Sequence, residues 1–475
     1  MIDDSTPLWP WFEGLSQIPR PSKHETEAKN WIRECLATHP VEIEEDGAGN
    51  LLLRKPAHPD ATNAPGIILQ SHLDMVPQKR DDVQHDFTRD PIRLEREGDW
   101  LRARGTTLGA DNGIGVAAIL AVMSDARMRH GPLEALLTVD EEAGMSGASG
   151  ADTEWFQGRL LLNLDTEEEN ELYIGCAGGV DVVITSGLPV IPADRAGWKV
   201  TVSGLKGGHS GIDIHKPRAN AIRLLARALL RLDDALGDLC IESFEGGTLR
   251  NAIARSASAA VTFRDNTSPS HILQVLEDTT QALLTDEPDL HWSVESVMPG
   301  RLTPADVTRP WLHALLDCPH GVLAWSEHFE GVVHTSANLG VVRWQPGHVQ
   351  VDCLPRSLDD AARDDAADRI RDIFGRLDAQ VCLEKPYPGW VPRPDSPLLT
   401  RARQVHEQVM GIAPGIQVIH AGLECGILGQ RAAHWDMISF GPTITGAHSP
   451  DERVNIPSVR RFWQYLTALL DALAR

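Results

Sequence analysis

The sequence predicts an α/β fold, with a central, mostly parallel sheet flanked by helices and an inserted α+β domain. First, short continuous apolar runs, typical of buried central strands, alternate with longer segments of helical periodicity. Second, the chain has 475 residues, more than a single hydrophobic core usually serves. Third, this alternation of apolar strands and helices gives way to a different sequence pattern near residue 188. It returns after a proline-dense segment at 386–395. We therefore expect one domain from 1–187 and 386–475, interrupted by a second from 188–385.

The first domain opens with two predicted helices and a hairpin. Apolar residues recur at helical spacing over 9–18 and again over 25–36, with a Pro-Arg-Pro break between the two segments. Residues 41–45 and 50–55 follow on either side of a glycine-containing turn. This arrangement is typical of a β-hairpin.

Three apolar runs in this domain, at 66–70, 133–139 and 160–164, predict central strands. Histidine or acidic side chains follow each run closely: His72, Asp74, Glu141, Glu142 and Asp165. Ligands of α/β sheets gather outside the carboxyl ends of the strands. We therefore expect these side chains to lie close together.

A glycine-rich turn at 105–115 places Asp111 between two apolar elements. Its glycines permit positive φ and close approach of other groups, and residues 114–123 predict a buried helix behind the turn. Taken alone, Asp111 is best interpreted as the N-cap of that helix. The neighbouring strand-end residues make a role in metal binding the competing hypothesis.

The inserted segment predicts a small antiparallel sheet with helices on one face. Strand-like runs at 198–203, 259–263 and 350–354 alternate with helical patterns at 219–232, 270–284 and 359–377. In the first of these helices Arg223, Arg227 and Arg231 form one stripe, which we interpret as a solvated face. Beyond residue 398 the α/β pattern returns, with strands expected at 416–420 and 435–440 and a final helix opening at Asn455.

Composition excludes several classes of partner. The formal net charge of -23 disfavours binding to nucleic acid or to anionic membranes. The seven cysteines form no CxxC pair, which argues against a disulfide framework and a thiolate zinc site. The first residues lack the features of a signal peptide, and no apolar run approaches the roughly 20 residues that span a bilayer. We expect a cytoplasmic protein.

The strand-end residues suit a pair of divalent metal ions, because two neighbouring ions need several carboxylates and imidazoles, one of them shared. Asp74 stands two residues from His72 and can accept its second ring N–H, which fixes the tautomer. Glu141 and Glu142 are adjacent, so an extended backbone would point them in opposite directions, one towards a metal and one towards substrate water.

Five motifs occur in an order that resembles the co-catalytic zinc metallopeptidases, in particular their aminoacyl-histidine dipeptidase branch. They are His72-x-Asp74, Gly109-Ala-Asp111-Asn-Gly, Asp140-Glu-Glu-x-Gly, Asn163-Leu-Asp165 and Ala447-His448-Ser-Pro. The similarity also covers Pro19-Arg-Pro-Ser, His420-Ala-Gly-Leu-Glu-Cys-Gly and Ser449-Pro-Asp-Glu. It implies the predicted fold, with 188–385 as a lid and dimerisation domain of a homodimer.

The resemblance further implies two divalent metal ions per subunit, expected to be Zn2+, with Co2+ or Mn2+ as the open alternatives. The implied ligands are His72, Asp111, Glu142, Asp165 and His448. Asp111 would bridge the ions, His72 and Asp165 would complete one, and Glu142 and His448 the other. Glu141 would be the general base, and the Asp111–Asn112 peptide bond would be cis.

Substrate contacts are implied as well. His209, in Gly-Gly-His-Ser-Gly, would stabilise the oxyanion, and Arg356 would grip the substrate carboxylate, a task suited to guanidinium. Asn251 would be a further contact. Glu424 would face the substrate α-ammonium or serve as a structural partner, and His420 and Asn338 would be lesser contacts.

The expected reaction is metal-dependent hydrolysis of dipeptides, Xaa-His such as β-Ala-His and a broader range. Two alternatives remain open at this point. An N-acyl amino acid deacylase would share the metal ligands without needing a free substrate amine, although Glu424 favours the dipeptidase. A catalytically silent metal-binding protein would keep the same fold, but the general base and all five ligands are present.

Overall fold

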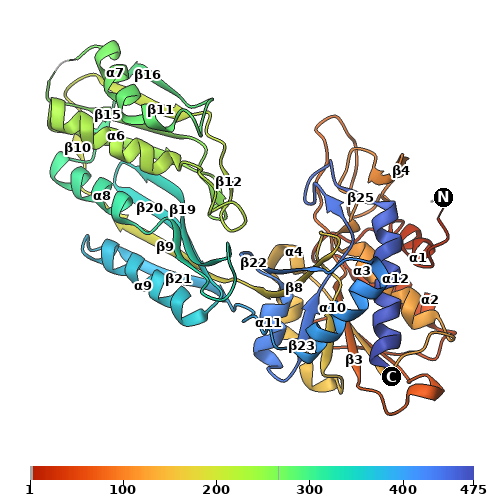
Figure 1. Ribbon diagram of the computed structural model, residues 1–475. Coiled ribbons are helices and arrows are strands. Elements are labelled where there is room, and N and C mark those ends of the chain that lie inside the picture. Colours follow the sequence, from red (N-terminus) through yellow and green to blue (C-terminus); the bar gives the residue numbers. More distant parts are fainter. Residues whose placement is uncertain (1–3, 266) are drawn as a thin grey trace. The chain divides into compact units, whose positions relative to one another are not determined.

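The computed structural model describes residues 4–265 and 267–475 and divides into two compact units (Figure 1). The first comprises the chain up to Gly175, Trp390–Val418 and Leu423–Arg475, and the second Cys176–Gly389 and Ile419–Gly422. The first boundary therefore lies one strand earlier than expected. Strand β9 (Gly178–Gly187) pairs with two strands of the second unit and belongs to that sheet.

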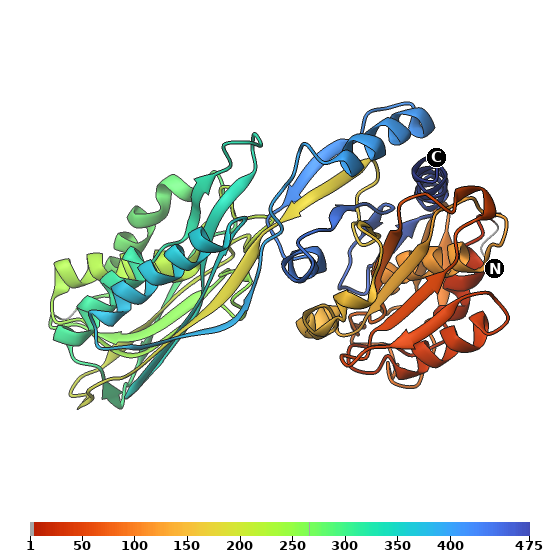
Figure 2. The same ribbon diagram turned by 90° about the horizontal axis from the view of Figure 1, so that it is seen from below.

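An eight-stranded mixed sheet forms the centre of the first unit, and the predicted α/β class is confirmed. Its strands, in spatial order, are β1 (Glu42–Glu45), β2 (Leu51–Lys55), β6 (Leu133–Thr138), β3 (Ile67–His72), β7 (Leu160–Asn163), β23 (Asp436–Ser439), β8 (Glu171–Cys176) and β22 (Gly415–Ile419). The four strands from β6 to β23 are parallel and lie side by side (Figure 2). The outer pairs β1–β2, β2–β6 and β8–β23 are antiparallel, and the hairpin supplies the first of them.

Helices pack around this sheet. They are α1 (Trp9–Leu15), α2 (Thr26–Leu36), α3 (Ala110–Ser124), α4 (Glu141–Gly144), α5 (Ser146–Gly150), α10 (Pro397–Met410), α11 (Glu424–Arg431) and α12 (Ile456–Leu473), with 3-10 turns at Pro59–Ala61 and Thr153–Trp155. Helix α3 contacts both α1 and β3, and its residues 114–123 are buried, as predicted. Helix α12 packs against α10, and the Asn455 side chain caps it by accepting the Ser458 N–H.

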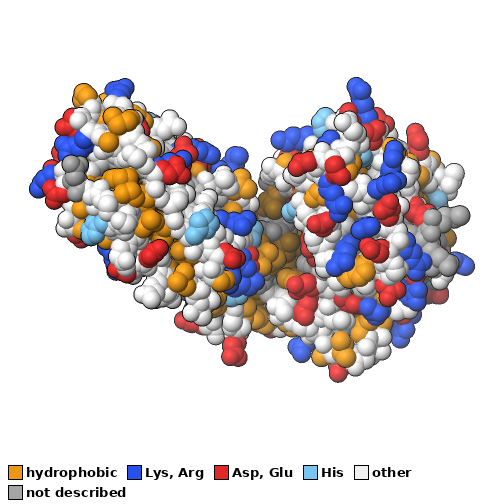
Figure 3. Space-filling view, turned by 90° about the horizontal axis from the view of Figure 1, so that it is seen from above, with side chains coloured by type: hydrophobic (Ala, Val, Ile, Leu, Met, Phe, Trp, Pro, Cys, Tyr) orange, Lys and Arg blue, Asp and Glu red, His pale blue; other side chains and the backbone are white. Residues whose placement is uncertain are grey.

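A second, four-stranded sheet of the first unit was not foreseen from the sequence. It consists of β24 (Ile444–Thr445), β25 (Arg453–Asn455), β5 (Trp100–Ala103) and β4 (Leu94–Glu97), in that order. Because β25 pairs with β5, the segment that contains His448 is attached beside the chain that leads to Asp111. Figure 3 shows acidic and basic side chains interspersed over this unit, at the right of the view.

The second unit contains an antiparallel sheet that is larger than expected. Its strands, in spatial order, are β16 (His291–Val297), β11 (Gly197–Ser203), β15 (Ala257–Thr262), β13 (Cys240–Gly246), β19 (Val333–Gln345), β20 (His348–Ser357), β9 and β21 (Gln380–Tyr387), and β18 (Gly321–Trp325) pairs with β19. Strands such as β16 and β19 mix polar and apolar residues without strict alternation, which is why the sequence pattern did not reveal them.

Helices α6 (Ala221–Leu236), α7 (Pro269–Thr280), α8 (Ala305–Asp317) and α9 (Asp360–Gly375) pack on this sheet, with a 3-10 turn at Gln281–Leu283. Figure 1 shows α6, α8 and α9 together on one face, as predicted. Two short pairs, β10 (Ile191–Pro192) with β17 (Arg301–Leu302) and β12 (Gly208–His209) with β14 (Ala252–Ile253), complete the unit.

The arginine stripe of α6 is only partly solvated. Arg227 and Arg231 are exposed, but Arg223 is half-buried and donates a hydrogen bond to the Cys318 carbonyl. Burial lowers the pKa of Arg223. Among the helices of the described ranges, none combines the length and the apolar character that crossing a membrane requires.

Candidate metal centre

The five expected metal ligands meet at one edge of the first unit's sheet. His72 ends β3, Glu142 follows β6 at the start of α4, and Asp165 comes just after β7. Because β3, β6 and β7 are parallel, their carboxyl ends lie at the same edge. Asp111 lies at the start of α3, where it and Asn112 have non-helical backbone angles, and His448 lies in the loop between β24 and β25.

Asp111 lies between the two histidines. Its Oδ1 is 3.1 Å from Nε2 of His72, and its Oδ2 is 3.2 Å from Nε2 of His448. Asp165 approaches the same His72 nitrogen at 3.3 Å, and Glu142 approaches the same His448 nitrogen at 3.0 Å. Two clusters that could each hold a metal ion therefore share Asp111: His72–Asp111–Asp165 and Asp111–Glu142–His448.

Asp111 does not cap its helix, so the N-cap interpretation is wrong. Its two carboxylate oxygens face His72 and His448 instead, and Asp111 and Asn112 have non-helical backbone angles that interrupt the start of α3. The Asp111–Asn112 peptide bond is cis, which confirms that expectation. A Cβ on Gly115 would lie 2.0 Å from Oδ1 of Asn112 and 2.5 Å from the Leu164 carbonyl, so this glycine lets the chain pack closely.

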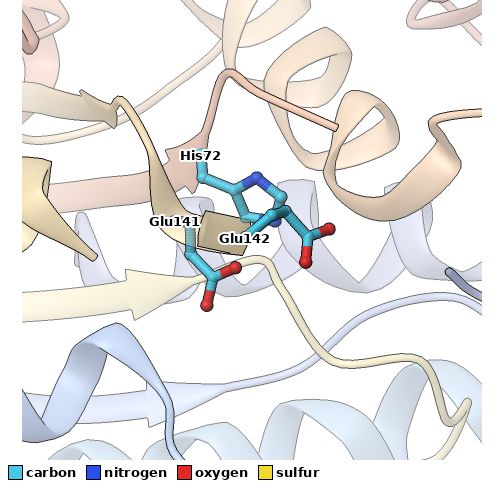
Figure 4. Close-up of side chains that lie close together, drawn as sticks. All are labelled: His72, Glu141 and Glu142. Atoms are coloured by element: carbon cyan, nitrogen blue, oxygen red, sulfur yellow. The ribbon is translucent and has the colours of Figure 1, made fainter. Parts of the chain in front are cut away.

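The argument that placed Glu141 and Glu142 on an extended backbone is wrong, because both residues begin the short helix α4. Their carboxyl groups still diverge on either side of the His72 ring (Figure 4). Together with His72 they form a third cluster of potential donor atoms. Glu142 thus lies near His448 and belongs to one of the two clusters that share Asp111. Glu141 belongs to neither of these two clusters.

Asp74 organises this part of the site. Its carboxylate accepts the backbone N–H groups of Glu141 and Glu142 at 3.0 and 3.1 Å and the Ser22 hydroxyl at 2.7 Å. Nδ1 of His72 lies 3.1 Å from the Asp74 carbonyl and 3.4 Å from its carboxylate. These contacts turn Nε2 of His72 towards Asp111, the arrangement expected of a residue that orients a metal ligand. Burial opposes ionisation, but the bonds to His72 and to the other donors lower the Asp74 pKa to about 2.

In the metal-free protein the carboxylates hold protons on the histidines. Burial opposes the charge on His72, yet Asp165 and the bonds to Asp111 raise its pKa well above the usual value. Hydrogen bonds with Asp111 and Glu142 raise the pKa of His448 to about 11. Burial raises the pKa of Glu141 well above its ordinary range.

The donor set fits divalent cations. Carboxylate and imidazole groups converge with an excess of acidic side chains, and this combination binds Zn2+ and similar ions. Oε1 of Glu142 is buried and has no hydrogen-bond partner within the described ranges, which leaves a ligand atom available.

Metal binding is expected to release protons and to tighten as the pH rises. Both histidines are protonated near neutral pH in the metal-free protein, because their pKa values are raised. An imidazole must be neutral to bind a metal, so each histidine loses its proton on binding. Isothermal titration with Zn2+ in buffers of different ionisation enthalpy measures this release. Binding without proton release at pH 7 would contradict the assignment of His72 and His448.

The expected substrate contacts His209, Asn251 and Arg356 all lie in the second unit. Nδ1 of His209 accepts the N–H groups of Gly211 and Ile212, both at 3.1 Å. In the neutral ring the proton is therefore on Nε2, which makes that atom a donor. Asn251 is exposed in the turn before β14.

Arg356 is buried and donates through Nη1 to the Tyr387 hydroxyl at 2.6 Å, while its Nε has no partner in the part of the chain described. Two further candidates make local contacts. His420 Nε2 lies 2.7 Å from the Ser336 hydroxyl. The Asn338 amide donates to the carbonyls of Arg250 and Ala252 and so holds the turn that carries Asn251.

Glu424 begins α11 and is completely buried in the first unit. Its Oε2 accepts hydrogen bonds from Gln70 at 2.6 Å and from Thr138 at 2.7 Å, so it joins strands β3 and β6. Burial raises its pKa to about 8. Oε1 of Glu424 makes no hydrogen bond to any described residue.

Sequence reasoning missed two buried residues that contact the Asp111 turn, Arg20 and Glu452. Both belong to motifs that contributed to the resemblance, Pro19-Arg-Pro-Ser and Ser449-Pro-Asp-Glu, but neither received a role. The charge of each residue, inside a motif shared with the family, was the signal in the sequence that could have indicated a role for it.

Residues 68–472 match the family model described as Peptidase family M20/M25/M40, and the chain belongs to this family. It is 44% identical over 475 residues to the cytosol non-specific dipeptidase of Escherichia coli (strain K12), covering 98% of this chain and 97% of the relative. The crystal structure of aminoacylhistidine dipeptidase from Vibrio alginolyticus superimposes with a TM-score of 0.87 at 42% identity, covering 99% of this chain and 97% of the other. A tripeptidase from Staphylococcus aureus shares the fold at 16% identity, with a TM-score of 0.59 and 99% of both chains covered.

Proposed function

We propose that this protein is a metal-dependent dipeptidase that hydrolyses Xaa-His dipeptides such as β-Ala-His and a broader range of dipeptides. The observation that carries the proposal is the pair of donor clusters that share Asp111, with Glu141 beside them. The names of the Escherichia coli and Vibrio alginolyticus relatives support it, since both are dipeptidases and both align over nearly the whole chain.

In this proposal His72, Asp165 and Asp111 would hold one ion, and Glu142, His448 and Asp111 would hold the other. Zn2+ is the proposed metal because carboxylate and imidazole ligands are typical of it, and Co2+ or Mn2+ would suit the same donors. When bound, the ions would lower the pKa of a water molecule and polarise the peptide carbonyl.

Glu141 is the proposed general base. It takes a proton from the attacking water and then gives that proton to the nitrogen of the leaving amine as the peptide C–N bond breaks. The position of Glu141 supports this role, because it lies outside the two clusters that share Asp111 and so keeps its carboxylate for proton transfer.

The remaining residues bind or orient. Asp74 holds the His72 ring and the first residues of α4. We propose that Nε2–H of His209 donates to the oxyanion, that Arg356 pairs with the substrate carboxylate, and that Asn251 adds a polar contact. Oε1 of Glu424 is the atom available for a substrate α-ammonium.

A substrate panel with metal analysis on the same sample tests the proposal. β-Ala-His and Ala-His are expected to be hydrolysed, and N-acetyl-His is expected to be left intact because it lacks a free amine. Turnover of N-acetyl-His alone would identify a deacylase instead. Metal-loaded protein that is inert towards every dipeptide would identify a catalytically silent relative.

We also propose a cytoplasmic homodimer. The Escherichia coli relative is named a cytosol enzyme, and the dimer follows from the family resemblance. Light scattering on the purified protein should give twice the chain mass of 52.0 kDa. A mass equal to that of one chain would contradict the dimer.

A further inference from the structure

The turn at 108–111 is held by a single buried carboxylate, that of Glu452. Oε2 accepts the backbone N–H groups of Leu108 and Gly109 at 2.7 and 2.9 Å. Oε1 accepts those of Ala110 and Asp111 at 2.8 and 3.2 Å. The Glu452 side chain is 2% exposed, so water does not replace these bonds. Four consecutive N–H groups thus depend on the two oxygens of one side chain.

Arg20 holds the same turn by its carbonyl side. This guanidinium, also 2% exposed, donates through Nη2 to the Gly109 carbonyl at 2.6 Å. Through Nη1 it donates to the carbonyls of Leu73 and Asp74 at 2.8 and 3.0 Å. Arg20 therefore ties the Asp111 turn to the segment that follows His72.

Glycine makes room for this guanidinium. A Cβ at Gly109 or at Gly113 would lie 2.6 or 2.7 Å from Nη2 of Arg20. The glycine-rich composition of the turn thus serves the approach of a buried charged side chain as well as its own backbone conformation.

Glu452 also connects two parts of the metal centre. It stands four residues after His448, immediately before β25. Its bonds to 108–111 therefore fix the His448 segment against the turn that carries Asp111. Nε2 of His448 lies 3.2 Å from Oδ2 of Asp111, and the bonds of Glu452 would keep this contact in place.

We propose that Glu452, supported by Arg20, is a positioning residue that sets the place of the Asp111 carboxylate between the two ion sites. Its carboxylate belongs to none of the three donor clusters and acts through the backbone of the turn. This inference rests on the proposed role of Asp111 as the shared ligand. Residues that orient metal ligands typically contribute about 10- to 100-fold in metal affinity.

The test is Glu452→Gln, measured by Co2+ binding and by the visible spectrum of the bound Co2+, which reports ligand geometry. The amide would present an NH2 group to two backbone N–H donors, so the turn must shift. We expect affinity for Co2+ to fall by about 10- to 100-fold, an altered spectrum, and a lower kcat with a smaller change in KM. Glu452→Asp keeps the charge but shortens the reach, and it should show a loss in the same direction. It serves as the test if Glu452→Gln does not fold.

Asp451→Asn is the matched control. It makes the same kind of change at the neighbouring residue, whose carboxylate is 78% exposed and pairs with Arg80, and it should behave as wild type. Wild-type affinity and spectrum in Glu452→Gln and Glu452→Asp would overturn the proposal, provided that Asp111→Asn binds Co2+ poorly. If Asp111→Asn also binds as wild type, the ligand assignment itself has failed.

Discussion

Replacing Glu141 with Gln is expected to leave metal binding intact and to slow dipeptide hydrolysis by about 10²- to 10⁴-fold, the usual contribution of a general base. The amide has nearly the same shape but cannot accept a proton from water. Glu141 is not a member of either cluster that shares Asp111, so both clusters keep their donors. The measurement is kcat for β-Ala-His or Ala-His, with the metal content of the same sample determined in parallel.

Glu154→Gln is a suitable control, because Glu154 is an exposed glutamate that belongs to none of the donor clusters. It should retain full activity. Undiminished kcat in Glu141→Gln would remove Glu141 from its role. Loss of metal together with activity would instead make Glu141 a ligand, as its place in the third cluster with His72 and Glu142 allows.

Replacing Asp111 with Asn is expected to have the opposite signature, in which metal and activity disappear together. The carboxylate faces His72 with one oxygen and His448 with the other, so the loss of its charge weakens both ion sites. The loss of affinity should exceed the about 10- to 100-fold typical of a residue that only orients a ligand. Equilibrium dialysis gives the stoichiometry, and activity should fall to the level of the metal-stripped protein.

The backbone N–H of Asp111 keeps its bond to Glu452 in this variant, so the turn is expected to hold its conformation. Circular dichroism of the metal-free proteins checks that Asp111→Asn is folded. Two ions bound to Asp111→Asn with wild-type affinity would show that Asp111 is not the shared ligand.

The central strands could be predicted because the apolar residues that bury each strand are consecutive in the sequence. The runs at 66–70, 133–139 and 160–164 are buried on both faces, so they read as continuous apolar segments, and they became β3, β6 and β7. The strands of the four-stranded sheet, β4 and β5 among them, are short and half-exposed and leave no such pattern.

The proposed metal ligands could be listed from the motifs, but the contacts that hold those residues in place could not. Glu141 and Glu142 were expected on an extended backbone, whereas a local helical turn forms there because Asp74 accepts both of their N–H groups. Glu452 is 344 residues from Leu108, and its partners are backbone N–H groups that every non-proline residue carries. No motif or residue spacing in a single sequence indicates such an interaction.

Anomalous diffraction from crystals of the Zn2+-loaded protein would test the shared role of Asp111 most directly. The account predicts two peaks that both contact the Asp111 carboxylate, one beside His72 and Asp165 and the other beside Glu142 and His448. A single peak, or a second peak without contact to Asp111, would contradict it.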